Sequence, residues 1–550
     1  MAAVSANKAA AKSVAVVLLT CGDWPPTFGQ GLDMSLSERI TKLEEEAASG
    51  ALDGQSWELY ASLMDAAGDL GGEDELTRLI ELGPQVEAAS SGWRGCWVLY
   101  CIANAWSALY TIRRYPKYAL SWEQPELANQ MFYLRSALQR ASAEDLPLPL
   151  RAQLRINLAN TFRSAGRIID ALDQWRAALL DRPGIAMAFG CRGEGLLYYG
   201  RHLYDSSHKL WLLDEARRNL KAAVMIGVGK DEATYPEAIE HFTSELARLQ
   251  AYLESGGCPD ELDQAAMDEF PLGNTEQERG YRQWCLDRRL FLNPMNDAFT
   301  SSIAAHDPLG LPDHIATDVG ITYLAFFNQM KQEYTYARWC LYAGSNSEKV
   351  HCADREVLLT MNGDSARYSI ALEQVKTSFR AAYSVLDKIA YFVNHRWDLG
   401  VAETRVDFAT IWTQPKGPQK GQVWPKLEAS QNLWLQALYR LSLDIHNSDD
   451  QAVAAPDARD IRILRNHLEH KFAKVVDIKS CSQTPDMLKD HLAYELDPQE
   501  LESKALRMLR TTRSALIYLS LALHRSETLQ ERGELVVAFD VATFEDERKM

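Results

Sequence analysis

The chain has 550 residues and a formal net charge of −17, with 47% hydrophobic and 24% charged residues. These fractions are those of a globular protein, so they exclude wholesale disorder and a fibrous chain. The acidity argues against a protein that coats nucleic acid through excess positive charge, although it allows a local basic cleft. The length predicts three to four domains, or two larger ones.

The nine cysteines are scattered and show neither a CxxC pair nor zinc-ligand spacing. They predict reduced, packed thiols, a cytoplasmic location and no bound metal. No apolar run approaches the roughly 18 residues that a membrane helix needs, so no membrane contact is expected. The basic and apolar stretch that ends near Cys21 is short for a secretion signal. We therefore interpret residues 1–35 as a flexible or mis-started leader.

Helical periodicity, with apolar residues at i, i+3, i+4 and i+7, covers most of the chain. Helices are predicted over residues 36–48, 56–68, 92–114, 124–142, 150–165, 168–181, 186–199, 211–226 and 235–254, and then over 320–344, 366–396, 426–446, 458–475 and 499–525. Between the two groups, residues 255–319 are rich in Gly, Pro, Asp and Asn. A single terminal strand is predicted within residues 535–544. The fold class is therefore all-α.

The predicted organisation has two helical domains joined by a packed junction. It comprises the leader, a helical repeat domain over 36–257, a junction over 258–319, a helical bundle over 320–525 and a C-terminal tail over 526–550. The junction contains an apolar and aromatic run from Trp284 to Leu292, which a free linker would not carry. We expect the junction to pack on the bundle.

Residues 151–184 have small and aromatic residues at the spacings of a tetratricopeptide repeat, which they resemble. The matching positions are Leu158, Ala159, Phe162, Gly166, Ala171, Trp175, Ala178 and Pro183. The alanines let two antiparallel helices approach closely, Gly166 permits the turn between them, and the proline ends the second helix. A second copy follows 34 residues on, with Gly193 and Gly200 at the places of Ala159 and Gly166. Stacked pairs of this kind predict a concave surface for a peptide, protein or small ligand, or else a scaffold that only orders the second half.

The most informative peptide is RNHLEH, from Arg465 to His470, in a predicted helix. Asn466 and His470 are i and i+4, so they share one face of that helix, and Arg465 lies at the edge of the same face. An imidazole near neutrality can take or give a proton, and a guanidinium can hold a phosphate by two hydrogen bonds. This combination is suited to the cleavage of a phosphodiester.

The Arg-Asn-x3-His pattern, late in a helical domain of about 200 residues, resembles the R-x4-6-H motif of the HEPN superfamily of metal-independent ribonucleases. Residues 281–294, 331–338 and 378–390 are similar to segments of the HEPN branch that follows tetratricopeptide repeats in bacteria, so that the resemblance covers roughly 275–525. It implies that Arg465 and His470 are a catalytic pair supported by Asn466. It also implies attack by the RNA 2′-OH with no metal or other cofactor, and a homodimer or higher oligomer whose motifs face one cleft. The family suggests a toxin-like effector in bacterial anti-phage defence, with a protein or small-ligand trigger on the repeat domain.

The spacing alone has low specificity. An Arg-x4-6-His spacing is expected by chance about once or twice in a chain with 12 histidines, and Arg201 to His208 also has it. Requiring Asn after the Arg lowers that expectation to roughly a few hundredths. The alternative is a non-catalytic repeat adaptor with a degenerate bundle that dimerises or binds a nucleotide, and nucleotide transfer is a third option. No Walker loop, GxGxxG or HExxH motif supports another chemistry.

Basic residues near the motif predict an RNA-binding groove. They are Arg462, His467 and Lys471 on the motif helix and Arg507 and Arg510 on the last helix. If the two helices are neighbours, these residues supply the positive charge that RNA phosphates require. A solvated basic face is the alternative for the last helix.

Further charged and aromatic side chains are candidates for the same cleft. Asp387, Lys331, Glu333 and Arg338 are candidates to line it, and Tyr383, Tyr391 and Trp397 are candidates to stack on bases. For the charged residues, an ion pair inside the bundle is the favoured role. For the aromatic residues, core packing is favoured over stacking on RNA.

Overall fold

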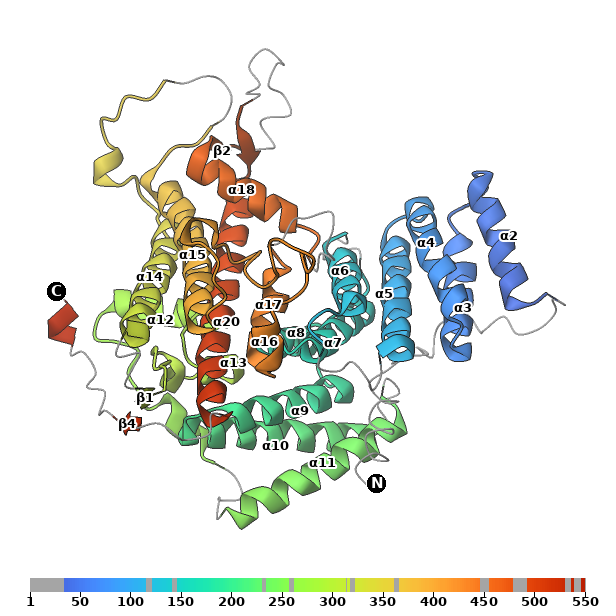
Figure 1. Cartoon of the computed structure of the whole chain (residues 1–550), viewed down its shortest axis with the longest axis horizontal. Helices are drawn as coiled ribbons and strands as arrows, with labels where there is room; N and C mark the ends of the chain where they lie inside the picture. The colour runs from blue at the N-terminus through green and yellow to red at the C-terminus, as the bar shows by residue number, and fades with distance from the viewer. Residues whose placement is uncertain are drawn as a thin grey trace. The chain divides into compact units, whose positions relative to one another are not determined.

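The computed structural model describes residues 34–114, 121–140, 146–229, 234–256, 262–312, 314–316, 322–360, 366–445, 455–477, 492–529, 536–538 and 546–549. Within these residues the fold is all-α apart from four short strands (Figure 1). The same residues contain no helix with the length and hydrophobicity of a membrane span. Two compact units divide the chain, a first unit that ends at Asp263 and a second unit that begins at Gln264, while residues 455–458 group with the first.

The first unit consists of helices that pack on one another in chain order. They are α2 (Leu36–Ala48), α3 (Ser56–Leu70), α4 (Glu73–Ala89), α5 (Trp93–Arg114), α6 (Pro125–Arg140), α7 (Leu148–Ser164), α8 (Ile168–Asp181), α9 (Ala186–His202), α10 (Ser206–Val228) and α11 (Pro236–Ser255). Helix α5 packs with α6, α7 with α8, and α9 with α10. The helices predicted for this half are confirmed, with ends that shift by a few residues.

Helix α4 is a helix that the sequence pattern did not predict. Gly83 and Pro84 stand inside it and interrupt the helical signal. The glycine is needed because a Cβ at position 83 would come within 2.5 Å of the Ile102 side chain and 2.8 Å of the Tyr60 hydroxyl. Close packing of α4 on α3 and α5 therefore explains a residue that otherwise disfavours helix.

The helix pair predicted for residues 151–184 is present as α7 and α8. The three small residues of its pattern, Ala159, Ala171 and Ala178, are all fully buried. Gly166 has a φ of +75°, the left-handed conformation that the tight turn between the helices requires. Trp175 is fully buried in the same pair. Each residue type in the repeat pattern thus occupies the environment that its chemistry predicts.

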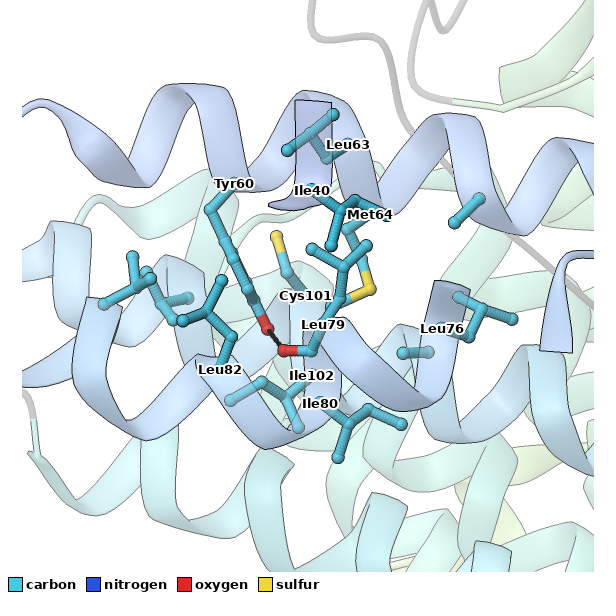
Figure 2. Packing of buried hydrophobic residues seen from close by; sticks show 14 of the residues in the cluster. Ile40, Tyr60, Leu63, Met64, Leu76, Leu79, Ile80, Leu82, Cys101 and Ile102 are labelled. Atoms are coloured by element: carbon cyan, nitrogen blue, oxygen red, sulfur yellow. Dashed lines mark hydrogen bonds between the residues drawn. The ribbon is translucent and has the colours of Figure 1, made fainter. Parts of the chain in front are cut away.

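The N-terminal helices share a continuous apolar core, shown in Figure 2. It includes Ile40, Tyr60, Leu63, Met64, Leu76, Leu79 and Ile102. The hydroxyl of Tyr60 donates a hydrogen bond of 2.8 Å to the carbonyl of Leu79, which satisfies its polar end inside this core. The first unit therefore has a hydrophobic core of its own, as an independently folding domain requires.

The second unit is a helical bundle with small two-stranded sheets. Its helices are α12 (Glu276–Asp287), α13 (Met295–Ala298), α14 (Thr322–Ser345), α15 (Ile370–Arg396), α16 (Pro425–Ala429), α17 (Leu433–Ser442), α18 (Ala458–His470) and α20 (Pro498–Leu529). Short 3-10 helices lie at Gln264–Asp268, Ser302–Ala304, Cys352–Asp354, Glu403–Arg405 and Asp546–Lys549. Helices α14, α15 and α20 run side by side and form the centre of the unit (Figure 1).

Two predicted helices of this half differ from the structure. The helix predicted over 426–446 is broken into α16 and α17 at Gln431, which has a φ of +47°. The helix predicted over 458–475 ends at His470, and β2 (Ala473–Val475) pairs in parallel with β3 (Tyr494–Leu496). All residues of β2 are buried, which a helix with one apolar face cannot achieve, and pairing with β3 satisfies the strand's backbone.

The C-terminal strand is partly within the described residues. Strand β4 (Val536–Ala538) pairs antiparallel with β1 (His314–Ala316). The remainder of the predicted strand over 535–544 lies outside the described residues, as does most of the predicted leader.

Candidate functional site

The motif helix α18 is held on the second unit by Ile461 and Leu464, both fully buried. Arg465 follows directly, so it lies at the edge of the buried face and reaches α15. Its Nη2 is 4.0 Å from Oδ2 of Asp387, and its Cζ is 5.4 Å from the centre of the Tyr383 ring. A carboxylate and an aromatic face thus contact the guanidinium of Arg465. The Arg465 side chain as a whole is still 30% exposed.

Asn466 supports this arrangement from the same helix. Nη1 of Arg465 donates a hydrogen bond of 3.3 Å to Oδ1 of Asn466. The Arg-Asn dipeptide therefore acts as one polar group at the edge of α18.

Asp387 is a carboxyl with unusual electrostatics. Burial, followed by the neighbouring Asp407, raises its pKa to about 6, although the N–H of Phe408 and the charge of Arg465 oppose the rise. The backbone N–H of Phe408 donates to Oδ1 of Asp387 at 3.2 Å, which orients the group. Burial is also the first cause that raises the pKa of Tyr383, so this phenol stays neutral. The site thus holds a carboxyl that changes charge close to neutral pH.

The two histidines of the motif have different environments. Nδ1 of His467 lies 2.8 Å from the carbonyl oxygen of Ile463, and its ring lies 5.4 Å from the ring of Tyr494 on β3. His470 is exposed, one turn beyond Asn466, and among the described residues its side chain has no hydrogen-bond partner. His470 is thus the imidazole of the motif that a ligand can reach, whereas His467 packs against the small sheet.

The basic residues predicted to bind RNA are divided between the surface and the interior. Arg462 on α18 and Lys471 just after its end are both exposed. On α20, Nε of Arg510 donates to the carbonyl oxygen of Arg288 at 3.2 Å, and Arg507 is partly buried. Arg513, on the same helix, is buried in an ion pair with Asp297. The side chains of Arg507, Arg510 and Arg513 are therefore directed largely into the second unit and do not form a solvated face.

The other charged candidates have structural contacts, as the favoured interpretation expected. Arg338 pairs with Asp307 at 2.8 Å, Glu333 pairs with Lys388 at 2.6 Å, and Lys331 donates to the backbone carbonyls of Asp307 and Leu309. Asp387 differs from these three because it faces the motif helix. Tyr383 is almost fully buried and contributes its ring to Arg465, while the hydroxyl of Tyr391 donates to Glu403 at 3.1 Å and Trp397 lies under Arg396.

Asp407 is a site residue that the sequence did not reveal. It lies in the loop after α15, half-buried, and acts on the pKa of both Asp387 and Tyr383. No spacing rule connects a loop carboxylate to a helix residue 20 positions earlier. Only the return of the chain onto α15 brings the two together.

Comparison with known proteins identifies the fold of this unit. Residues 316–526 match the family described as LA2681-like HEPN. The matched residues include α15, α18 and the whole Arg465 site. The match begins later than the resemblance predicted from the sequence, which started near residue 275. No match is found among curated proteins or among solved structures. Residues 316–526 therefore contain a domain of the HEPN type.

Proposed function

We propose that this protein is a metal-independent RNA endonuclease of HEPN type. The observation that carries the proposal is Arg465, held between Asp387, Tyr383 and Asn466. The exposed imidazole of His470 lies five residues further along the same helix. A HEPN domain is compatible with a role as a nuclease or in nucleotide binding, and this cation and imidazole favour the nuclease.

Each residue has a defined part in the proposed reaction. The 2′-oxygen of RNA attacks the adjacent phosphorus, the P–O5′ bond breaks, and a 2′,3′-cyclic phosphate and a 5′-hydroxyl result. His470 exchanges the proton that leaves the 2′-OH or joins the 5′-oxygen. Arg465 binds the phosphate and stabilises the charge that develops on it, while Asn466 and Asp387 orient Arg465.

The surroundings of the site suggest how RNA and partners are bound. Arg462 on α18 and Lys471 just after it are exposed and are the first candidates for phosphate contact. His467, Arg507 and Arg510 keep this proposed role only where RNA competes with their contacts inside the unit. A homodimer that brings two copies of His470 to one cleft would supply the exposed imidazole with neighbours. We assign the first unit the recognition of a trigger, and the whole protein a toxin-like role in bacterial anti-phage defence.

The exposure of His470 favours one alternative. An imidazole without an orienting partner also fits a non-catalytic adaptor, whose repeats recruit a partner and whose bundle only dimerises or binds a nucleotide. The adaptor and the nuclease differ in whether RNA is cut.

Cleavage of labelled single-stranded RNA in EDTA tests the proposal. We expect wild-type protein to produce fragments with cyclic phosphate ends, and His470→Ala and Arg465→Ala each to lose about 100-fold or more in rate. His395→Ala, which removes an exposed histidine of α15, is the matched control and should cleave at the wild-type rate. Cleavage that persists in both motif variants refutes the assignment, and a wild-type protein that does not cut RNA supports the adaptor.

A further inference from the structure

The loop between α15 and α16 ends in an anchored hairpin, residues 411–424. Its two arms meet at the bridge between Thr413 and Val423, and the N–H of Gln414 donates to the carbonyl oxygen of Gln422 at 2.9 Å. Ile411 and Trp412 are buried at its base, whereas all residues of the tip, 415–420, are exposed. An apolar base therefore holds a tip that stands in solvent.

The charge of this hairpin is opposite to that of the protein. Residues 408–426 contain three lysines and no Asp or Glu, in a chain with a net charge of −17. Lys426 is engaged with Asp398 at 2.7 Å. The other two, Lys416 and Lys420, lie at the exposed tip and form no ion pair within the described part of the chain. The tip thus presents two unneutralised positive charges.

The hairpin is joined to the Arg465 site at its root. The N–H of Phe408, which is fully buried, donates to Asp387, and the indole N–H of Trp412 donates to the carbonyl oxygen of Phe408 at 2.7 Å. The same root carries Asp407, which acts on Asp387. Lys416 is four residues beyond the buried Trp412, a reach of about 13 Å at strand geometry. That reach spans a few nucleotides of an RNA strand.

We propose that the tip of this hairpin binds the sugar-phosphate backbone of the single-stranded RNA that is cut at Arg465. The inference rests on the proposed function and extends it to a substrate-binding element outside the motif helix. Lys416 and Lys420 act as flexible point charges on phosphates, which gives affinity without base specificity. The buried base fixes where these charges stand relative to Asp387 and Arg465, so the hairpin sets the path of the strand.

The test is RNA binding by the full chain in a His470→Ala background, in which the proposed nuclease cannot cut. Binding of a labelled single-stranded oligoribonucleotide is measured over a series of salt concentrations, with and without Lys416→Ala and Lys420→Ala together. We expect roughly tenfold weaker binding and a decrease of about 1.4 in the slope of log K against log salt, since two phosphate contacts are lost. The control is Lys349→Ala with Arg355→Ala, which changes the net charge equally through exposed cations elsewhere on the unit and should bind like the parent.

The outcomes separate this inference from the proposed function. Equal binding by the hairpin variant and the control variant overturns the inference, even if wild-type protein cuts RNA. A hairpin-specific loss supports it, even if wild-type protein does not cut RNA and the nuclease proposal fails. Absence of RNA binding by the parent protein at low salt overturns it as well.

Discussion

Asp387 is the residue at which the candidate site conflicts with the stability of the fold. Its carboxyl lies half-buried beside Asp407, and burial together with that second carboxylate raises its pKa to about 6. Arg465 offsets this rise in the pKa only in part, because its guanidinium and the carboxylate are 4.0 Å apart and both remain partly in solvent. A charged group kept where charge is disfavoured is typical of functional sites.

Replacement of Asp387 by Asn should therefore stabilise the protein at neutral pH. The pKa is raised in the folded state, so the favourable contribution of the protonated acid is present near pH 4 and is lost as the pH rises through 6. We expect Asp387→Asn to unfold with a free energy on the order of 1–2 kcal/mol above wild type at pH 8, and equal to it near pH 4. Urea unfolding at several pH values measures this.

The same variant should lose RNA cleavage, because Asn cannot pair with Arg465 as a carboxylate does. Asp460→Asn, on the exposed face of α18, is the matched control and should keep wild-type stability at each pH. A stability difference between Asp387→Asn and wild type that is the same at every pH would contradict this account.

At the scale of elements, one carboxylate joins three helices of the first unit. Glu194 on α9 accepts from Arg163 on α7 and pairs with His241 on α11. Burial alone would raise the pKa of Glu194, but the two cations lower it to about 2, and the bond to Glu194 raises the pKa of His241. Glu245 of the same helix also raises the pKa of His241, whereas burial and Arg163 lower it. The ion pair between α9 and α11 thus depends on protonation of His241.

We expect His241→Gln to destabilise the first unit in a manner that depends on pH. The pKa of His241 is raised in the folded state, so its contribution is complete below pH 6.5 and is lost as the pH rises through the folded pKa. The decrease in the free energy of unfolding should be on the order of 1 kcal/mol at pH 6 and should shrink as the pH rises through the raised pKa of His241. Hydrogen exchange of α11 and thermal unfolding measure it. In a Glu194→Gln background the pH dependence should vanish, and a pH dependence that survives there rules out this pair as its source.

At the scale of the whole molecule, the region that matches the HEPN family and the compact second unit begin at different residues. The HEPN match begins at residue 316, whereas the second unit begins at Gln264. The intervening segment supplies Asp297 to the buried Arg513 at 2.5 Å, and Asp307 to the buried Arg338. Both arginines belong to the matched region and both carboxylates lie before it. The bundle therefore needs the earlier segment to neutralise its own interior.

Fragments test this dependence. A fragment of residues 264–550 should unfold cooperatively, since both buried ion pairs are retained. A fragment of residues 316–550 leaves two buried guanidinium groups unpaired, at a cost of about 3–5 kcal/mol each, and should lack a cooperative transition. Circular dichroism during thermal unfolding compares the two, and a shorter fragment that melts like the longer one would disprove the requirement.

The sequence by itself determined the local features of this protein. Helical periodicity predicted the all-α class and most helices, because that signal lies within a few residues of the chain. The turn at Gly166 and the HEPN resemblance around Arg465 and His470 are local in the same sense. The break of a predicted helix at Gln431 and the strand that follows His470 were missed, since a left-handed residue and a strand partner leave little trace in local pattern.

The tertiary structure decided which of these local features meet. It placed Asp387 beside Arg465 and Asp407 near Asp387, directed the arginines of α20 into the unit, and left His470 in solvent. None of these outcomes follows from spacing, because each depends on how helices far apart in the chain pack their faces together. A pattern of residues specifies the face that a helix buries, but the partner of that face, and the charge on it, is set only when the bundle closes.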